Sequence, residues 1–439
     1  MIVRNSADTE SAIESLLPFV PVDELGCYVD KPAEPNNVHL EVVLDGHLDP
    51  AGLHAAVHDT LAAHPLARAR RGRWHGWHRR FNWEIVGAPD QSPVDHVRWR
   101  TEEELAGHRQ SLLDSAPPLD LSPPLRVRHA VGPDQDVLIL NVHHAAMDGL
   151  SCLRLLRSIA RRYAGRPDPV GADPLAVRVP AGGLGSPAQG AVKARYPRPA
   201  ARIAVDSADP GPGCGFRLLS MPAATVRSGS AELGATVNDV LIATLVLAIE
   251  EWNGTHGRDA GTIRIAMPIN ARATAGADEP LGNLSRLAVI ASKPADRRSA
   301  DALLTDITRQ TAAAKLPGGP QIDPISRLFA TPLLPVAVKA WLLAIAQRLV
   351  GPAIVDTSLL SNLGQVGEPP DFDPDTRAAG LWFSPAVRMP AGLSVGVVTL
   401  NDRLNLCFRY RRELLDHRAA DRFAATFRAA LDAFGIPGS

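Results

Sequence analysis

The chain has 439 residues, of which 45% are hydrophobic, so it can bury a large core and is neither a disordered tail nor a small disulfide-stapled domain. At about 150 residues per domain, this length predicts two or three domains. Lys and Arg number 46 against 47 Asp and Glu, and the formal net charge of −1 provides no overall field that would attract nucleic acid or an anionic membrane. The composition therefore favours a small or weakly charged partner.

The cysteines and the N-terminus both indicate an intracellular protein. Cys27, Cys152, Cys214 and Cys407 show no CxxC spacing, which argues against a disulfide framework and against a thiolate zinc site. Residues 1–14 contain three acidic residues and no apolar run after a basic cluster, so no secretory signal is predicted. We expect a cytoplasmic location.

In the first half of the chain, helices and strands are predicted to alternate. Asp49-Pro50 reads as an N-cap followed by proline at the first helical position, and it opens an amphipathic helix that runs to Ala63. Leu125–Val131 and Asp136–Val142 read as a hairpin closed by a Gly-Pro-Asp-Gln turn. A further helix is expected from Leu150.

Residues 165–215 are so rich in glycine and proline that neither a helix nor a central strand is expected there. We therefore predict an N-terminal lobe over residues 1–180, a crossover over residues 181–215 and a C-terminal lobe over residues 216–439. The two lobes are of similar size.

The second half is expected to repeat the alternation. Thr236-Val237-Asn238-Asp239 predicts an N-cap for a helix that runs to Trp252, and a strand is expected at Ile263–Met267. Leu393–Leu400 and Leu404–Tyr410 predict a second hairpin, and an amphipathic helix is expected from Asp416.

The most apolar stretch of the chain is Leu328–Val350. Prolines and charged or amide side chains interrupt it well short of the about 20 residues that a membrane span requires. We expect a buried or pocket-lining helix here, and contact with a membrane surface is the alternative.

The motif most informative about chemistry is His143-His144-Ala145-Ala146-Met147-Asp148-Gly149, which lies between a predicted strand and a predicted helix. Adjacent side chains on extended backbone point to opposite faces, so only one of the two histidines can face a given cleft, which disfavours metal chelation by the pair. Loops at strand ends commonly carry catalytic groups. The alternative is two structural histidines followed by an aspartate that caps the next helix.

With this HHxxxDG motif, the chain resembles the chloramphenicol-acetyltransferase superfamily, which includes condensation domains of nonribosomal peptide synthetases, polyketide-associated acyltransferases and wax ester synthases. The resemblance implies an α/β fold with mixed sheets, in which two lobes enclose an active-site channel. Weaker echoes outside the motif are Leu48–Leu66, Thr236–Asp239, Met267–Arg272, Pro280–Asn283 and Ser361–Gly364.

The resemblance also implies roles for the motif residues, and His143 is counted with the catalytic group. His144 would be the general base that takes a proton from an attacking amine or hydroxyl, or would position that nucleophile. Asp148 would pair with Arg272 in a structural role. Gly149 would leave room for the pantetheine arm of the donor.

Three residues are candidates for contacting the oxyanion or the substrate: Ser361, Asn362 and Asn283. Ser361 and Asn362 follow an apolar run, as the loop at the end of a strand would, and an amide donor aimed at the oxyanion contributes about 3 kcal/mol in measured cases. The alternative is a plain turn with Gly364 at positive φ.

Two clusters suggest other chemistry. Arginines interleave with Trp74 and Trp77 in residues 68–80, a mixture that can bind nucleic acid; we expect a solvated hairpin face or a contact for an acidic carrier protein instead. Four histidines lie on or beside the first helix without a further ligand of defined spacing, so we expect surface histidines and no metal; they are His47, His54, His58 and His64.

The sequence thus predicts a free-standing condensation-type acyltransferase with no bound metal or redox cofactor. Its donor would be acyl-CoA or a phosphopantetheine-linked acyl group, and its acceptor a small molecule with an amine or hydroxyl. A carrier protein acting in trans is a possible partner; neither nucleic acid nor a membrane is expected, and the protein is expected to be a monomer. The alternative is a catalytically silent or repurposed module of the same fold that binds a carrier protein.

Overall fold

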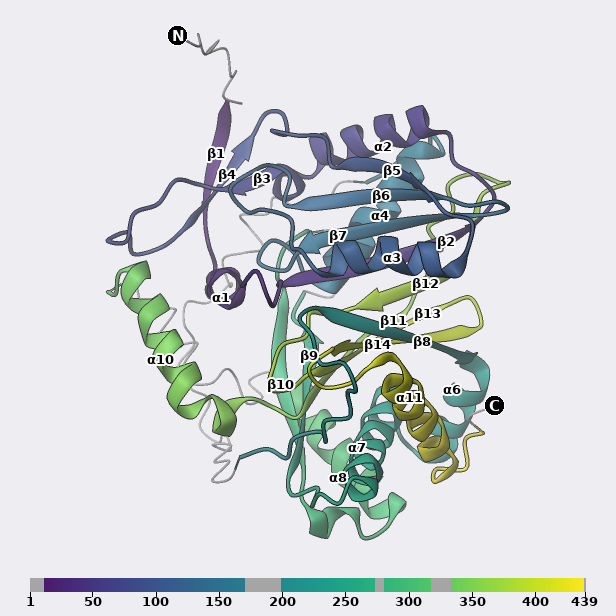
Figure 1. Cartoon of the computed structure of the whole chain (residues 1–439). Coiled ribbons are helices and arrows are strands. Elements are labelled where there is room, and N and C mark those ends of the chain that lie inside the picture. Colours follow the sequence, from purple (N-terminus) through teal and green to yellow (C-terminus); the bar gives the residue numbers. More distant parts are fainter. Residues whose placement is uncertain (1–11, 170–198, 273–279, 317–332, 438–439) are drawn as a thin grey trace.

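Two layered α/β bodies, each built on one mixed sheet, make up most of the molecule (Figure 1). This computed structural model describes residues 12–169, 199–272, 280–316 and 333–437. Residues 181–198 of the predicted crossover lie outside the described residues.

The first body is built on a five-stranded sheet. Strands β5 and β6 are parallel and the other neighbours are antiparallel. In spatial order the strands are β12 (Arg377–Ser384), β2 (Asn37–Asp45), β7 (Asp136–His143), β6 (Leu125–Val131) and β5 (Val94–Arg98). The helices of this body are α2 (Pro50–Ala63), α3 (Glu102–Leu113) and α4 (Gly149–Tyr163).

The second body is built on a six-stranded sheet, in which β11 is parallel to both of its neighbours. Its order is β10 (Ser285–Ser292), β9 (Ile263–Asn270), β11 (Ser358–Gln365), β13 (Leu393–Leu400), β14 (Arg403–Arg411) and β8 (Cys214–Pro222). Its helices are α6 (Ala223–Glu232), α7 (Val237–Thr255), α8 (Ala300–Lys315) and α11 (His417–Asp432).

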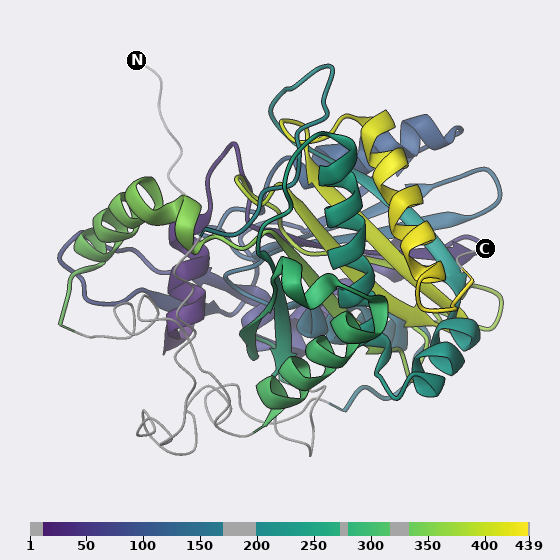
Figure 2. The same cartoon turned by 90° about the horizontal axis from the view of Figure 1, so that it is seen from below.

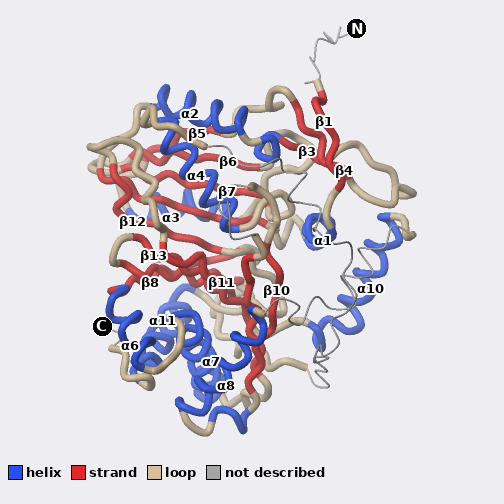
Figure 3. The backbone as a smooth tube through the Cα atoms, turned by 180° about the vertical axis from the view of Figure 1, so that it is seen from behind, coloured by secondary structure: helices blue, strands red, loops and turns tan. Residues whose placement is uncertain are grey.

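A third, three-stranded sheet lies at one edge of the molecule with helices α1 and α10, as the view from behind in Figure 3 shows. Its strands are β1 (Ile13–Pro18), β4 (Asn82–Val86) and β3 (Ala69–Arg71), and the helices are α1 (Pro21–Val29) and α10 (Val336–Ile354). Two short 3-10 helices complete the chain, at Pro65–Arg68 and Pro294–Arg297.

The predicted helix starts and hairpins are confirmed. The side chain of Asp49 accepts a hydrogen bond from the Gly52 N–H at the start of α2, and Thr236 forms a capping box with Asp239 at the start of α7. The hairpins β6–β7 and β13–β14 form at the predicted positions, the second through Asn401 at a φ of 53°.

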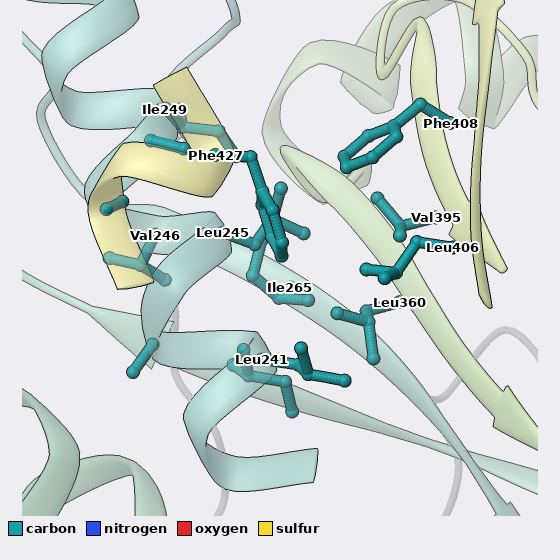
Figure 4. Packing of buried hydrophobic residues seen from close by; sticks show 14 of the residues in the cluster. Leu241, Leu245, Val246, Ile249, Ile265, Leu360, Val395, Leu406, Phe408 and Phe427 are labelled. Atoms are coloured by element: carbon teal, nitrogen blue, oxygen red, sulfur yellow. The ribbon is translucent and has the colours of Figure 1, made fainter. Parts of the chain in front are cut away.

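The core of the second body lies between its sheet and helices α7 and α11, where apolar side chains from all of them interdigitate (Figure 4). The core of the first body also takes in residues from the second half of the chain, including Leu381 and Phe383 of β12. Because β12 pairs with β2, the two halves share both a sheet and a core, which holds them together.

The apolar stretch Leu328–Val350 was expected to form a buried helix, but its described part is exposed on one side. Its residues up to 332 lie outside the described part of the chain, and α10, which follows, packs one side against α1 and exposes the other. Among the described helices none is by itself long and apolar enough to cross a membrane; α6 and α7 would be so only as a pair, with a bend of 92° between them.

Candidate active site

The HHxxxDG segment forms the connection between β7 and α4. Strand β7 is buried throughout and ends at His143, and α4 begins at Gly149 with Asp148 as its N-cap, whose side chain accepts from the Ser151 N–H at 2.9 Å. The backbone N–H of His144 donates to the carbonyl of Asn36 at 2.8 Å. These bonds hold the backbone on both sides of the His144 side chain.

Close packing against α1 explains the small residues inside the motif. A Cβ built on Gly26 of α1 would lie 2.9 Å from the Cα of Ala145, so the two backbones approach more closely than any larger residue would permit. Ala145, Ala146 and Met147 are fully buried. The backbone of the motif is therefore closely packed against α1.

The side chain of His144 is partly buried and is held in one tautomer. Its Nδ1 lies 3.2 Å from the carbonyl oxygen of Met147, which can only accept, so Nδ1 carries the proton and the lone pair remains on Nε2. Burial lowers the pKa of His144; the Asp148 carboxylate opposes this shift and the nearby Arg388 adds to it. His144 is therefore neutral at pH 7 and can accept a proton at Nε2.

His143 has a different environment, and its assignment to the catalytic group is not supported by its geometry. Its side chain is 1% exposed, its Nδ1 accepts from the Ala145 N–H at 3.0 Å, and its Nε2 lies 3.4 Å from Asp30. Burial works against ionisation of Asp30, but the contact with the His143 ring and the hydrogen bond from the Asn36 N–H outweigh it and lower the pKa of this carboxyl. Both ring nitrogens of His143 face the protein itself, so His143 positions the loop.

The predicted pairing of Asp148 with Arg272 is formed, and it joins the two halves of the chain. The guanidinium binds both carboxylate oxygens, with Nη2 2.8 Å from Oδ1 and Nη1 3.0 Å from Oδ2. The Leu284 N–H and the Ser285 hydroxyl also donate to Oδ2, each at 2.9 Å. Burial by itself would raise the pKa of Asp148. The charge and hydrogen bonds of Arg272 outweigh burial and lower this pKa below its usual value, so the buried carboxyl stays ionised.

Asn283 holds the motif backbone through its amide group, and its contact with the substrate stays a prediction. Its Nδ2 lies 2.9 Å from the carbonyl of His144 and 2.8 Å from that of Ala145, and the third short contact of this nitrogen is with the buried carboxylate of Asp23. The neighbouring Gly282 carbonyl accepts from the Asp148 N–H. Residues 282–285, from the second half of the chain, thus hold the motif loop by hydrogen bonds.

The space beside Gly149 is not left open for a donor arm, contrary to the expectation. A Cβ built on Gly149 would lie 2.7 Å from the ring of Phe383 and 2.9 Å from the side chain of Leu363, both from the second half of the chain. Glycine is needed here because β11 and β12 pack directly against the start of α4.

We expect Gly149→Ala to lower the free energy of unfolding by about 1–3 kcal/mol, because the added methyl overpacks a buried contact. Chemical denaturation monitored by circular dichroism measures the change. Gly254→Ala in α7 is the matched control, since nothing lies within 4 Å of its added methyl, and it should leave stability unchanged or raise it. Equal stability losses in the two variants would contradict this account of Gly149.

Ser361 and Asn362 lie within β11 and not in a loop at its end, so that prediction is wrong. The strand continues to Gln365 through an irregularity at Gly364, whose φ is 79°, because parallel pairing with β13 carries the backbone onward. Asn362 lines a hollow on the side of α6 and α7 and accepts from the Gly364 N–H, away from the motif. The side chain of Ser361 alternates to the opposite face of the strand, the face of Leu363. Ser361 therefore remains a candidate for contacting the oxyanion or the substrate.

Arg388 is a charged residue of the site that the sequence did not reveal. It lies in the loop between β12 and β13, and its Nη2 donates to the side chain of Asn36 at 2.9 Å, while the backbone of Asn36 binds His144. Burial lowers the pKa of Arg388 to about 10, so it stays charged at pH 7. No motif marks this arginine, since only the crossing of β12 into the first sheet brings its loop to the histidine.

Several side chains of the two other clusters contact other parts of the protein. His64 is buried, not on the surface, with Nε2 2.8 Å from the Ser158 hydroxyl, and His47 lies beside Asp136. Among the described residues no group of three or more His, Cys, Asp or Glu could hold a metal ion. In the arginine cluster, Arg70 pairs with Glu84 and Asp90, each at 2.9 Å, which reduces its positive charge.

Two mycobacterial proteins are similar to this chain over most of its length. It is 35% identical over 420 residues to the uncharacterized protein Rv2305 of Mycobacterium tuberculosis strain H37Rv, and the match covers 90% of this chain and 94% of that protein. The uncharacterized protein MT2362 of strain CDC 1551 matches equally. A dimodular nonribosomal peptide synthase of Bacillus subtilis is 30% identical over 139 residues, which are 31% of this chain and 6% of the synthase. No family model matches.

Solved structures confirm the predicted superfamily fold. The first condensation domain of the calcium-dependent antibiotic synthetase, in complex with a substrate analogue, superposes with a TM-score of 0.69 at 16% identity, over 98% of each chain. The wax ester synthase/diacylglycerol acyltransferase of Marinobacter aquaeolei has a TM-score of 0.59 at 18% identity, over 95% of this chain and 98% of that chain.

Proposed function

This chain belongs to one family with the mycobacterial proteins Rv2305 and MT2362 and has the chloramphenicol-acetyltransferase-like fold, and on this premise we propose that it transfers an acyl group from a thioester to an amine or hydroxyl. The observation that carries the proposal is the geometry of His144, a neutral imidazole whose protonated nitrogen is turned to a carbonyl and whose other nitrogen, Nε2, makes no hydrogen bond to the described residues. The site lies where both halves of the chain meet.

In the proposed reaction His144 Nε2 takes the proton of the acceptor amine or hydroxyl as its nitrogen or oxygen attacks the thioester carbonyl. The new C–N or C–O bond forms, the C–S bond breaks, and the proton passes to the departing thiolate. Asp148 and Arg272 do not touch the reacting atoms and act by fixing the loop. Two lobes around the reaction would also keep water from the thioester.

The pH dependence of the reaction should follow the protonation of His144. Because burial holds the pKa of this imidazole below its usual value of about 6.5, the base form persists at neutral pH and is lost only as the pH falls through the lowered pKa. We expect kcat/KM to stay level from neutral pH down to about pH 6.5 and to decline below it. An acid limb centred above pH 7 in the measured profile would contradict the proposed base.

We also propose that Arg388 stabilises the oxyanion that develops on the thioester carbonyl. Among the described residues its guanidinium makes one hydrogen bond, to Asn36, which leaves other N–H groups able to donate beside His144. A charged donor aimed at an oxyanion in a partly dry site is among the stronger catalytic interactions. Ser361 remains the proposed hydroxyl donor on the facing strand.

Arg388→Gln is therefore expected to reduce kcat by about 10²-fold, as the loss of one oxyanion donor does in measured enzymes. Arg388→Lys should retain part of the activity because it keeps the charge. Since the cation lowers the pKa of His144, Arg388→Gln should also move the acid limb of the pH profile to higher pH, which tests the electrostatic coupling of the two side chains. Arg418→Gln, on the exposed part of α11, is the control.

Mass spectrometry of the products tests the function directly. The full chain is incubated with a panel of acyl-CoA thioesters and acyl-carrier proteins, together with small amines and alcohols, and a new ester or amide is sought. Formation of a product with acyl-carrier protein but not with acyl-CoA would support a carrier partner in trans. Binding of carrier protein without any acyl transfer would overturn the proposed activity and favour the silent carrier-binding module.

A further inference from the structure

Helix α10 exposes several apolar side chains to the solvent and buries a lysine against the protein. The exposed residues Ala337, Trp341, Ala344 and Arg348 recur at a helical spacing on one face, with Val338 beside them. Trp341 is 62% exposed and Val338 38% exposed. Figures 1 and 2 show α10 at one edge of the molecule beside α1, outside the two large bodies.

A buried ion pair fixes this orientation. Lys339 is completely buried, and its Nζ lies 3.1 Å from Oε1 of Glu24 in α1 and 3.0 Å from the carbonyl of Arg79. The Tyr28 hydroxyl donates to the same carboxylate at 2.6 Å. Turning α10 to bury its tryptophan would remove Lys339 from these partners, so the apolar face is held outward.

The loop of residues 72–80 continues this face. The Ala337 N–H donates to the carbonyl of Gly76, and a Cβ built on Gly76 would lie 3.3 Å from the Cβ of Ala337, so the loop is in contact with the first turn of α10. Trp77, next to Gly76, is 71% exposed. The loop and the outer side of α10 thus form one surface, which we call the α10 face: residues 72–80 together with Ala337, Val338, Trp341, Ala344 and Arg348.

The charges of the α10 face are all of one sign. Residues 72–80 contain three arginines and no acidic residue, and α10 contains no Asp or Glu. Arg79 and Arg348 are exposed, and at a rise of 1.5 Å per residue about 16 Å of helix separates Ala337 from Arg348. Exposed tryptophans flanked by arginines, with no acidic neighbour on the helix, are complementary to an anionic lipid surface.

We propose that the α10 face binds the interface of an anionic phospholipid bilayer, with Trp77 and Trp341 inserted at the level of the headgroups. Aromatic side chains with one polar edge are favoured at this depth, and a helix with one apolar face lies in the plane of the membrane without crossing it. The near-zero net charge that argued against a membrane averages over the whole chain and does not describe this one face. The proposal does not depend on the proposed acyl transfer.

Vesicle flotation tests the proposal with the full chain and no substrate. Vesicles of phosphatidylcholine alone are compared with vesicles of equal parts phosphatidylcholine and phosphatidylglycerol. We expect the protein to float with the anionic vesicles, less so at high salt, and the double variant Trp77→Ala/Trp341→Ala to lose at least about fivefold in bound fraction. Leu233→Ala, at the exposed end of α6 on the opposite side of the molecule, should float like the unchanged protein.

We expect the double variant and the unchanged protein to give matching circular dichroism melts, because both substituted side chains are exposed. Equal flotation of the double variant and the unchanged protein would overturn the proposal, as would the absence of flotation with anionic vesicles. If light scattering instead shows a dimer that the double variant loses, with no vesicle binding, the face is an interface between two copies of this chain and the lipid proposal fails.

Discussion

Replacement of His144 by alanine is expected to lower kcat/KM by about 10²-fold or more while the protein stays folded. The substitution removes the lone pair at Nε2 that would take the acceptor's proton. It also removes the hydrogen bond between Nδ1 and the Met147 carbonyl, so the free energy of unfolding should fall by no more than about 1.5 kcal/mol.

Activity assays paired with denaturation curves separate the two effects. His58→Ala is the matched control, since the His58 side chain is 74% exposed on α2 and its loss should change neither quantity. Unchanged turnover in His144→Ala would remove this histidine from the mechanism. A large loss of stability would instead make it a structural residue, like His143.

Asp148→Asn should reduce both stability and activity, through the loop and not through the chemistry. The substitution leaves the guanidinium of Arg272, which is 9% exposed, without its anionic partner, and breaking one side of a buried pair costs about 3–5 kcal/mol. The pKa of Asp148 is lowered in the folded protein, so its stabilising effect is complete above its unfolded pKa of about 4 and is lost only as the pH falls through the lowered value.

Two further variants test whether the loss in Asp148→Asn comes from an unpaired buried charge. Asp206→Asn, which breaks the partly exposed pair with Arg422, should cost at most about 1 kcal/mol. The double variant Asp148→Asn/Arg272→Met should recover part of the lost stability, because no unpaired charge remains. Wild-type stability combined with lost activity in Asp148→Asn would place this carboxylate in the chemistry and contradict the structural role.

Local patterns in the sequence were sufficient to predict the motif's immediate surroundings. The strand that ends at His143 and the helix that begins at Gly149 depend on apolar periodicity and on capping by Asp148, which are interactions within a few residues of the chain. The pairing of Asp148 with Arg272 came from the resemblance to a family, because neighbouring residues carry no sign of a partner 124 positions away.

The predictions that failed depend on contacts between distant segments. Ser361-Asn362 reads locally as a turn, yet pairing with β13 extends the strand through it. The resemblance implied open space beside Gly149, yet Phe383 and Leu363 pack against it from the second half of the chain. Each outcome was decided by packing across the two halves, which no local pattern encodes.

The sequence by itself thus determined the elements, the fold class and the place of the HHxxxDG motif between a strand and a helix, because capping, periodicity and a short motif act over a few neighbouring residues. Only the tertiary structure decided the tautomer of His144, the hydrogen bonds from Asn283 to the motif backbone and the position of Arg388 beside Asn36. It also decided that α10 turns its tryptophan outward, since the buried pair between Lys339 and Glu24 joins side chains 315 positions apart. These features arise where β12 crosses between the halves and α10 docks on α1, and long-range geometry of this kind has no local signature.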